Sequence, residues 1–461
     1  MPSKEFVPSL TRIIDSDGRK LSLLSLALPK FAEKLFNNLI GLVSTVMLAG
    51  YADNAVGASA TANQIINLVH AIYCIASTGA TILCGIELGR SDRTKAAVIA
   101  GNAFTLCMLI SIISSGALCI FAEPLMVGMN LEADALEYAV IYLRIRGGFI
   151  FILAINSFLN SMLICNGYTV YTMINGIGST ILATFFNYLL LYREIIPGVT
   201  GTKASAIASV LACSISFVYM LCVFISKKCP FTLAFGKDVV IEIFRIGLPA
   251  AAATILYTLS QTITTGTMAD LGISSLNAKA YIATIVAYIS YASDALSGAM
   301  QILIGRYAGR EDTDSIKRLC RICLRFSVGT NLALSLGVLA FHGALMSLFT
   351  SDPEIIAIAR VIFFVDVAVE IFRAVNTVMQ NALNACRDVR TTFIAGVISC
   401  WCGSVLLSIL LGNVLGLGLL GYWIAFTLDE AFRSAVFIIR WRREKWQKNI
   451  VCPKTAESQA V

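Results

Sequence analysis

Long uncharged stretches alternate with short charged connections along almost the whole chain. Residues 54–86, 147–192 and 391–428, for example, contain no Lys, Arg, Asp or Glu. A membrane-spanning helix needs about 20 consecutive, mostly apolar residues. The pattern therefore predicts an all-α polytopic membrane protein with twelve transmembrane helices. The predicted helices cover residues 24–50, 56–86, 94–121, 135–164, 169–192, 202–226, 242–269, 276–305, 315–349, 355–385, 389–412 and 419–441.

The composition agrees with a membrane protein and argues against other classes. Of the 461 residues, 57% are hydrophobic and only 14% are charged, whereas about 25% of residues are charged in a soluble domain. This balance is not that of a disordered chain, a nucleic-acid-binding domain or a secreted disulfide scaffold. The 14 Cys are scattered through apolar stretches without the further ligands that a metal site would need. We therefore expect no metal site and no organic cofactor.

Basic residues are concentrated in every second connection between the predicted helices. Together with the two terminal segments, these connections hold 24 Lys and Arg, whereas the opposite connections hold 3. Loops on the cytoplasmic side of a membrane carry an excess of Lys and Arg. The distribution predicts a multi-pass protein of the plasma (inner) membrane with both termini in the cytoplasm, as an even number of helices requires.

The two halves of the chain align with a constant offset of 220 residues. Leu28-Pro29 matches Leu248-Pro249, Gly89-Arg90 matches Gly309-Arg310, and Asn156 matches Asn376. Six helices separate equivalent points, so the halves have the same orientation and form a parallel repeat around a pseudo-two-fold axis. Pro29 and Pro249 fall early in the first and seventh predicted helices, where a proline interrupts the hydrogen bonding. They are candidates for a hinge, with a fixed kink as the alternative.

The repeat predicts two six-helix bundles, which is typical of secondary transporters. No phosphate-binding loop for a nucleotide is present, so the expected source of energy is an ion gradient or a partner protein. The predicted organisation is a cytoplasmic tail (1–20), an N-lobe (21–226), a cytoplasmic linker (227–241), a C-lobe (242–441) and a second cytoplasmic tail (442–461).

Several short segments, in their order and spacing, resemble the prokaryotic MATE (multidrug and toxic compound extrusion) transporters of the MOP flippase superfamily. They are Leu28-Pro29 followed by residues 41–47, the turn at residues 87–92 and the segment 142–145. The resemblance implies two bundles of six helices and export of amphipathic, often cationic compounds in exchange for H+ or Na+. It also implies a monomer whose partners are a small-molecule solute and the bilayer, with no nucleic acid and no enzymatic activity.

The chain departs from the family in the N-lobe. The family commonly has an Asp at the position of Ser44, and an Asn and an Asp where this chain has Ala183 and Asn187. Ser and Asn do not titrate near neutral pH. The departure leaves open whether coupling is lost or lies elsewhere, and we expect it in the C-lobe.

Ionisable residues inside predicted helices are candidates for cation coupling, because a charge within the bilayer is costly. The candidates are Asp294, Glu370, Asp366 and Glu33, with Asp294 and Glu370 expected to share one H+ or Na+. The alternative for Glu370 is a structural ion pair with Arg373, three residues later. A further charged group, Asp429, Glu430 and Arg433, is predicted nearer the cytoplasmic end of the last helix.

Polar residues form stripes along several predicted helices, and about half of them are expected to hold helices together rather than to contact solute. The alternative function is a flippase for a lipid-linked saccharide, whose phosphates would need basic residues such as Arg144, Arg146 or Arg373. An enzyme lacks support, since there is no His cluster and no motif of nucleophile and base. The candidates for the substrate cleft are Asn37, Ser44, Asn63, Gln64, Asn67, Asn156, Asn160, Asn187, Arg373, Asn376 and Gln380.

Overall fold

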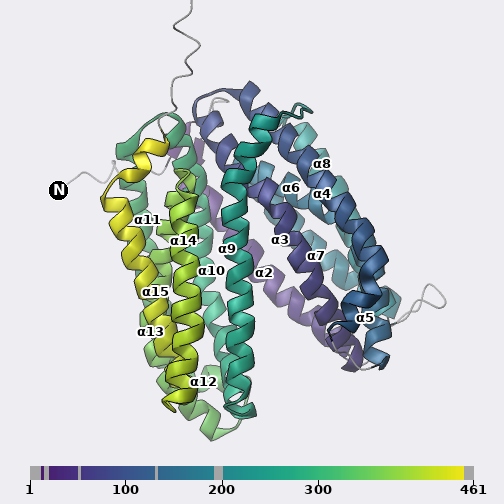
Figure 1. Ribbon diagram of the computed structural model, residues 1–461, viewed down its shortest axis with the longest axis vertical. Coiled ribbons are helices and arrows are strands. Elements are labelled where there is room, and N and C mark those ends of the chain that lie inside the picture. The colour runs from purple at the N-terminus through teal and green to yellow at the C-terminus, as the bar shows by residue number, and fades with distance from the viewer. Residues whose placement is uncertain (1–11, 15–19, 50–52, 130–132, 192–200, 451–461) are drawn as a thin grey trace, which may run out of the picture. The chain divides into compact units, whose positions relative to one another are not determined.

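The computed structural model describes residues 12–14, 20–49, 53–129, 133–191 and 201–450 (Figure 1). Within these ranges the side chains of residues 41–49 and 53–57 are outside the description. Nearly all of the described chain is helical. One antiparallel pair of short strands, β1 (Arg12–Ile14) and β2 (Lys20–Ser22), precedes the first helix, with Ile13 opposite Leu21.

The first half of the chain forms seven described helices. They are α2 (Leu23–Ala49), α3 (Asp53–Gly89), α4 (Arg93–Val127), α5 (Ala133–Gly148), α6 (Ile150–Cys165), α7 (Thr169–Leu191) and α8 (Gly201–Ser226).

The second half is also helical throughout its described residues. Its elements are α9 (Lys237–Ala269), α10 (Ile273–Gly309), α11 (Thr313–Ala340), α12 (His342–Met346), α13 (Pro353–Ala385), α14 (Val389–Ser399), the π-helices η1 (Cys400–Leu407) and η2 (Leu410–Val414), α15 (Gly418–Arg442) and the 3-10 helix η3 (Lys445–Asn449).

Seven helices of the described chain are long and apolar enough to cross a membrane, or eight if the bent pair α5–α6 is counted as one span. This number establishes a multi-pass helical protein. The predicted span 135–164 is in fact two helices that meet at an angle of 52°. Gly147 and Gly148 precede this bend, and a Cβ on Gly147 would lie 2.9 Å from the Cβ of Leu118. The close packing of α4 against this point requires a residue without a side chain, and glycine pairs are common at helix kinks.

Two other predicted helices are also interrupted. The expected helix 315–349 ends at Ala340, and after Phe341 the short α12 follows in a new direction. The expected helix 389–412 changes from α14 to π-helical turns at Cys400. Hydropathy measures length and polarity but not the hydrogen-bond register, so it does not reveal either change.

The described chain divides into two compact units. Unit 1 contains residues 1–31, 88–91 and 252–461, and unit 2 contains residues 32–87 and 92–251. Helix α2 passes from unit 1 to unit 2 after Phe31, and α9 passes from unit 2 to unit 1 after Ala251. Each passage lies two residues after a proline inside the helix, Pro29 in α2 and Pro249 in α9.

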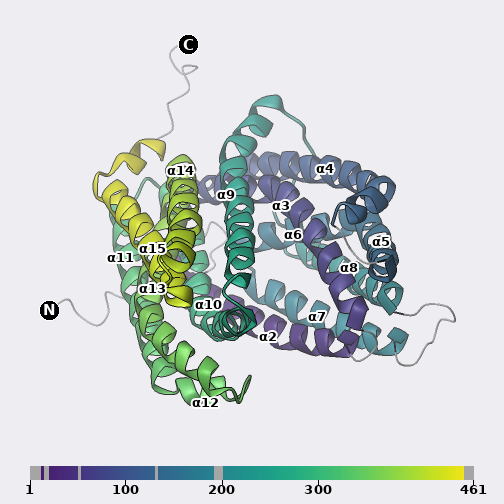
Figure 2. The ribbon, with the colours of Figure 1, turned by 60° about the horizontal axis from the view of Figure 1, so that its bottom comes forward.

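Each unit has its own apolar core. In unit 2, the core contains Tyr73, Leu143 and several alanines that let helices approach closely. In unit 1, where α13 packs against both α10 and α15 (Figure 2), the core contains Phe363 and Trp423. A Cβ on Gly412 would lie 2.3 Å from the ring of Tyr422, so a residue without a side chain is needed where η2 meets α15.

The repeated turns at residues 89–92 and 309–312 have the same local structure. Asp92 caps the N-terminus of α4 by accepting a hydrogen bond of 2.9 Å from the backbone N–H of Lys95. Asp312 caps α11 through the N–H of Ser315 at 3.0 Å. The residue before each cap adopts a positive φ, 63° at Ser91 and 58° at Glu311.

Candidate functional site in unit 1

Unit 1 encloses a polar cavity of about 550 Å³ between α9, α10, α13, α14 and α15. Its walls carry more carboxylates than basic groups, which is unusual inside a bundle of apolar helices. Apolar side chains such as Val369 and Phe426 form the rest of the lining. The polar lining residues include Tyr257, Gln261, Lys279, Ser290, Asp294, Asp366, Arg373, Asn376, Gln380, Asp429, Glu430 and Arg433.

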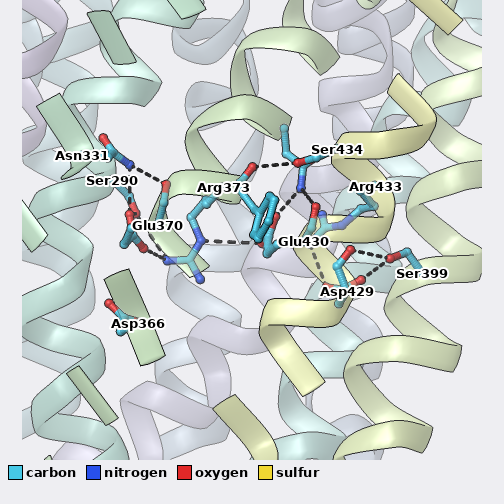
Figure 3. A network of polar contacts seen from close by, with 12 residues as sticks. Ser290, Asn331, Asp366, Glu370, Arg373, Ser399, Asp429, Glu430, Arg433 and Ser434 are labelled. Carbon is cyan, nitrogen blue, oxygen red and sulfur yellow. Dashed lines mark hydrogen bonds and ion pairs between the residues drawn. The ribbon is translucent and has the colours of Figure 1, made fainter. Parts of the chain in front are cut away.

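Arg373 connects two carboxylates from different helices (Figure 3). Its Nη1 forms an ion pair with Glu370, one helical turn earlier in α13. Its Nε lies 3.6 Å from Oε1 of Glu430 in α15. The predicted pair of Glu370 and Arg373 therefore forms, and it extends to a second acid that sequence spacing did not connect to it.

Glu370 is completely buried, and both of its carboxylate oxygens have partners. The hydroxyl of Ser290 donates to Oε2 at 3.3 Å, and Nδ2 of Asn331 donates to the same oxygen at 3.0 Å. Ser293 in turn donates to Oδ1 of Asn331 at 2.5 Å. Helices α10 and α11 thus help to hold the Glu370 carboxylate in place, and Ser290 also accepts a hydrogen bond of 3.5 Å from Nη1 of Arg373.

A second group of charges lies in α15. Arg433 donates to Asp429 at 2.8 Å and to Glu430 at 2.9 Å. Ser399 of α14 donates to Asp429, and Asn376 of α13 donates to the carboxylate of Glu430. Glu430 stands at the midpoint of α15, so the group occupies the central part of that helix.

Asp366 differs from the other acids of the cavity. It is 3% exposed, and its contact with a described side chain is a hydrogen bond of 3.0 Å from Nε1 of Trp423 to Oδ1. No described basic group forms an ion pair with it. A carboxylate has four lone-pair positions, so Asp366 can still accept a proton or contribute to a cation site.

The other candidates of this unit have distinct places. Asp294 and Gln380 line the cavity, and Ser290, one turn before Asp294 in α10, provides the link from that helix face to Glu370. Asn376 contacts Glu430 and accepts a hydrogen bond of 3.1 Å from Ser434. Asn376 therefore connects α13 to α15, which is the role expected for about half of the polar residues.

The candidates of unit 2 that the structure describes lie on four helices, α2, α3, α6 and α7. Asn37 accepts a hydrogen bond of 3.0 Å from Thr180 of α7. The carboxylate of Glu33 lies close to the same helix, because a Cβ on Gly176 would be 2.7 Å from its Oε1. Gln64 and Asn67 are exposed, and the side chain of Ser44 lies outside the description. Asn156, Asn160 and Asn187 have buried amide oxygens without a hydrogen-bond partner in the described part of the chain.

Sequence reasoning did not find Ser290, Asn331, Ser399 and Trp423. These residues are uncharged and lie on four different helices, and hydroxyl, amide and indole groups are common in transmembrane segments. Their proximity to the acids depends on how the helices pack. The only sequence feature that indicated this region was the presence of charged residues inside predicted membrane helices.

The helices, their apolar length and the buried charges together define a multi-pass membrane transporter. The MatE family model matches residues 29–189 and 249–410. The two matches begin at residues that the repeat predicted to be equivalent. The chain therefore belongs to the MatE family, as its sequence motifs indicated.

Relatives and solved structures agree with this assignment. The chain is 30% identical to the uncharacterized transporter YisQ of Bacillus subtilis (strain 168), over 96% of this chain and 98% of that protein. It is 25% identical to the probable multidrug resistance protein NorM of Thermotoga maritima, over 97% and 96%.

The fold is similar to that of an outward-facing multidrug resistance MATE family transporter of the MOP superfamily, with a TM-score of 0.85 and 15% identity over 93% of this chain and 96% of that one. A MOP superfamily transporter from Pyrococcus furiosus gives a TM-score of 0.84 and 14% identity over the same shares.

Proposed function

We propose that this transporter is a secondary antiporter that exports small amphipathic, often cationic compounds in exchange for H+ or Na+. The observation that carries the proposal is Asp366, a buried carboxylate that lines the cavity of unit 1 and forms no ion pair with a described basic group. Such a group can bind and release a cation as the cavity opens to each side of the membrane. Relatives named as probable multidrug resistance proteins support amphipathic compounds as the substrates.

The geometry favours Asp366 over Glu370 as the group that takes up the coupling ion. Glu370 is held by Arg373, Ser290 and Asn331, so a cation would have to displace an existing partner. Asp366 needs no such displacement. Asp294 lines the same cavity and is the second carboxylate of this proposal, and Glu33 of unit 2 remains a further candidate.

The remaining parts of the proposal follow the family architecture. Twelve helices form two lobes related by a parallel pseudo-two-fold repeat, and the paired matches of the family model support this arrangement. Pro29 and Pro249 act as hinges, which agrees with their places two residues before α2 and α9 pass from one unit to the other. The protein functions as a monomer in the plasma membrane with both termini in the cytoplasm.

The alternative, a flippase for a lipid-linked saccharide, is not favoured by this cavity. Arg373 and Arg433 are both paired with carboxylates, so neither guanidinium is available to bind a phosphate.

The test is gradient-driven export of ethidium, a lipophilic cation, from proteoliposomes. An imposed pH gradient and an imposed Na+ gradient identify the coupling ion for the native chain. We expect Asp366→Asn to abolish gradient-driven export and Asp294→Asn to reduce it. The matched control is Asp270→Asn, which changes an exposed Asp in the turn after α9 and should leave export unchanged. Full coupled export by Asp366→Asn would contradict this assignment.

A further inference from the structure

Arg146 of unit 2 is a half-buried arginine that the proposed coupling mechanism does not use. It lies 13 residues after Ala133, the first residue of α5, and two residues before the end of that helix. At 1.5 Å per residue it is about 20 Å from the first residue of α5. The 16-residue helix α6 then continues in a direction bent by 52°. Arg146 therefore lies near the middle of the membrane-spanning region.

The polar contacts of Arg146 are all with neutral groups. Its Nη1 lies 2.5 Å from Oδ1 of Asn63 and 2.7 Å from the hydroxyl of Tyr142. No carboxylate of the described chain forms an ion pair with it. Its partner Tyr142 belongs to the apolar core of unit 2, which also includes Leu143 and Ile66. A guanidinium in such surroundings without a counter-ion is energetically unfavourable.

Some arginines of the described helices have carboxylate partners. Arg373 and Arg433 are paired in unit 1. Arg144, two residues before Arg146, lies 3.3 Å from Glu123 at an exposed position. Arg146 is half-buried, as Arg373 is, but no described carboxylate forms an ion pair with it.

The free edge of the guanidinium has the geometry of an anion site. Both hydrogen bonds of Arg146 use Nη1, and Nε and Nη2 have no partner in the described chain. These two nitrogens form the edge that binds a carboxylate through two parallel hydrogen bonds. Asn63 and Tyr142 hold the side chain in place from the other edge. The residue is only half-buried, so the free edge is accessible.

We infer that Arg146 binds the carboxylate of a transported amphipathic compound. The inference rests on the proposed export function and narrows its substrates to compounds that include carboxylates and zwitterions as well as simple cations. The anionic group of the solute supplies the counter-ion that the protein itself lacks at this position.

Two related dyes test this inference by equilibrium binding, without any gradient. Rhodamine 110 carries a free carboxylate, and rhodamine 123 is its methyl ester. Binding to the purified full chain in a neutral detergent is followed by fluorescence anisotropy. We expect Arg146→Gln to weaken binding of rhodamine 110 by about tenfold or more, as for loss of a charged hydrogen bond, and to change binding of rhodamine 123 less than twofold. Arg144→Gln is the matched control and should change neither.

A second variant guards against a general loss of folding. Asn63→Asp places a carboxylate beside Arg146 and leaves the arginine intact. We expect the melting temperature of this variant to equal or exceed that of the native protein. We also expect it to lose affinity for rhodamine 110, as Arg146→Gln does. Arg146→Lys keeps the charge but not the two-nitrogen edge, and should give an intermediate affinity for the carboxylate dye.

Three results would overturn the inference. Equal weakening of both dyes by Arg146→Gln would assign the residue a structural role. Unchanged binding of both dyes would exclude it from the site. Competition between phosphatidylglycerol and rhodamine 110 in the native chain, absent in Arg146→Gln, would assign the anion to a lipid headgroup instead of a solute. The binding measurements use no ion gradient. The comparison of the two dyes can therefore be interpreted even if the ethidium assay contradicts the antiport proposal.

Discussion

Removal of the Arg373 guanidinium is the sharpest perturbation of the charge network in unit 1. The side chain joins Glu370 in α13 to Glu430 in α15, and both acids are at least nine-tenths buried. Arg373→Gln keeps a polar side chain of similar length and removes the charge. Glu370 would then be a buried anion without a nearby cation, although its hydrogen bonds from Ser290 and Asn331 would remain.

The magnitude follows from the cost of breaking a buried ion pair. Removing one partner of such a pair costs about 3–5 kcal/mol. The side chain of Arg373 is 29% exposed. Because the ion pair is partly accessible to solvent, we take the lower end of this range. For a folding unit of this size, 1 kcal/mol shifts the melting temperature by about 2–4 °C. We therefore expect Arg373→Gln to lower the melting temperature by about 6–12 °C at pH 8.

A second substitution distinguishes charge from packing as the cause of this loss. Adding Glu370→Gln to Arg373→Gln removes the uncompensated charge and should restore at least half of the lost stability at pH 8. A deficit caused by lost packing would remain in the double variant.

Thermal unfolding of the purified protein in detergent measures these differences. The matched control is Arg360→Gln in the same helix, because Arg360 is exposed and no described carboxylate forms an ion pair with it. A melting temperature for Arg373→Gln equal to that of Arg360→Gln would refute the reasoning. A deficit that Glu370→Gln does not relieve would also refute it.

Two further predictions concern backbone packing and helix capping. A Cβ on Gly101 would lie 1.8 Å from the backbone oxygen of Thr232, so Gly101→Ala should destabilise the protein by about 1–3 kcal/mol. The control is Gly116→Ala in the same helix, which should not destabilise the protein because a Cβ there meets no atom within 4 Å. Equal melting temperatures of the two variants would contradict this prediction. The N–H of Lys95 donates to Asp92 and lowers the pKa of that carboxyl, so the stability it provides is present above about pH 4 and is lost as the pH falls further. Asp92→Ala should cost about 1 kcal/mol at pH 7 and less at pH 3, whereas Asp92→Asn, which caps equally well without titrating, should melt close to the native protein at pH 7.

The helices of this protein were largely predictable because the bilayer sets their length. The predicted segment 169–192 corresponds to α7 (Thr169–Leu191), and 202–226 corresponds to α8 (Gly201–Ser226). Apolar length alone identifies such helices, since each must cross about 30 Å of hydrocarbon. The family was equally accessible, because its motifs occur at fixed spacings in both halves.

The pairing of Glu370 with Arg373 was predictable for a related reason. The two residues are one helical turn apart, so local geometry places them together before any helix packs. Their charges inside an apolar segment also indicated a functional region without any knowledge of the fold.

The tertiary structure alone decided which partners complete the network. Glu430, Asn331 and Trp423 reach the charges of α13 from α15 and α11, and nothing in their sequence positions indicates those contacts. The contacts leave the Glu370 carboxylate with three partners and Asp366 with one hydrogen-bond donor. Hydrophobicity along a chain determines where helices lie in a bilayer, but helix faces meet only through packing, and packing determines which buried charge has a partner.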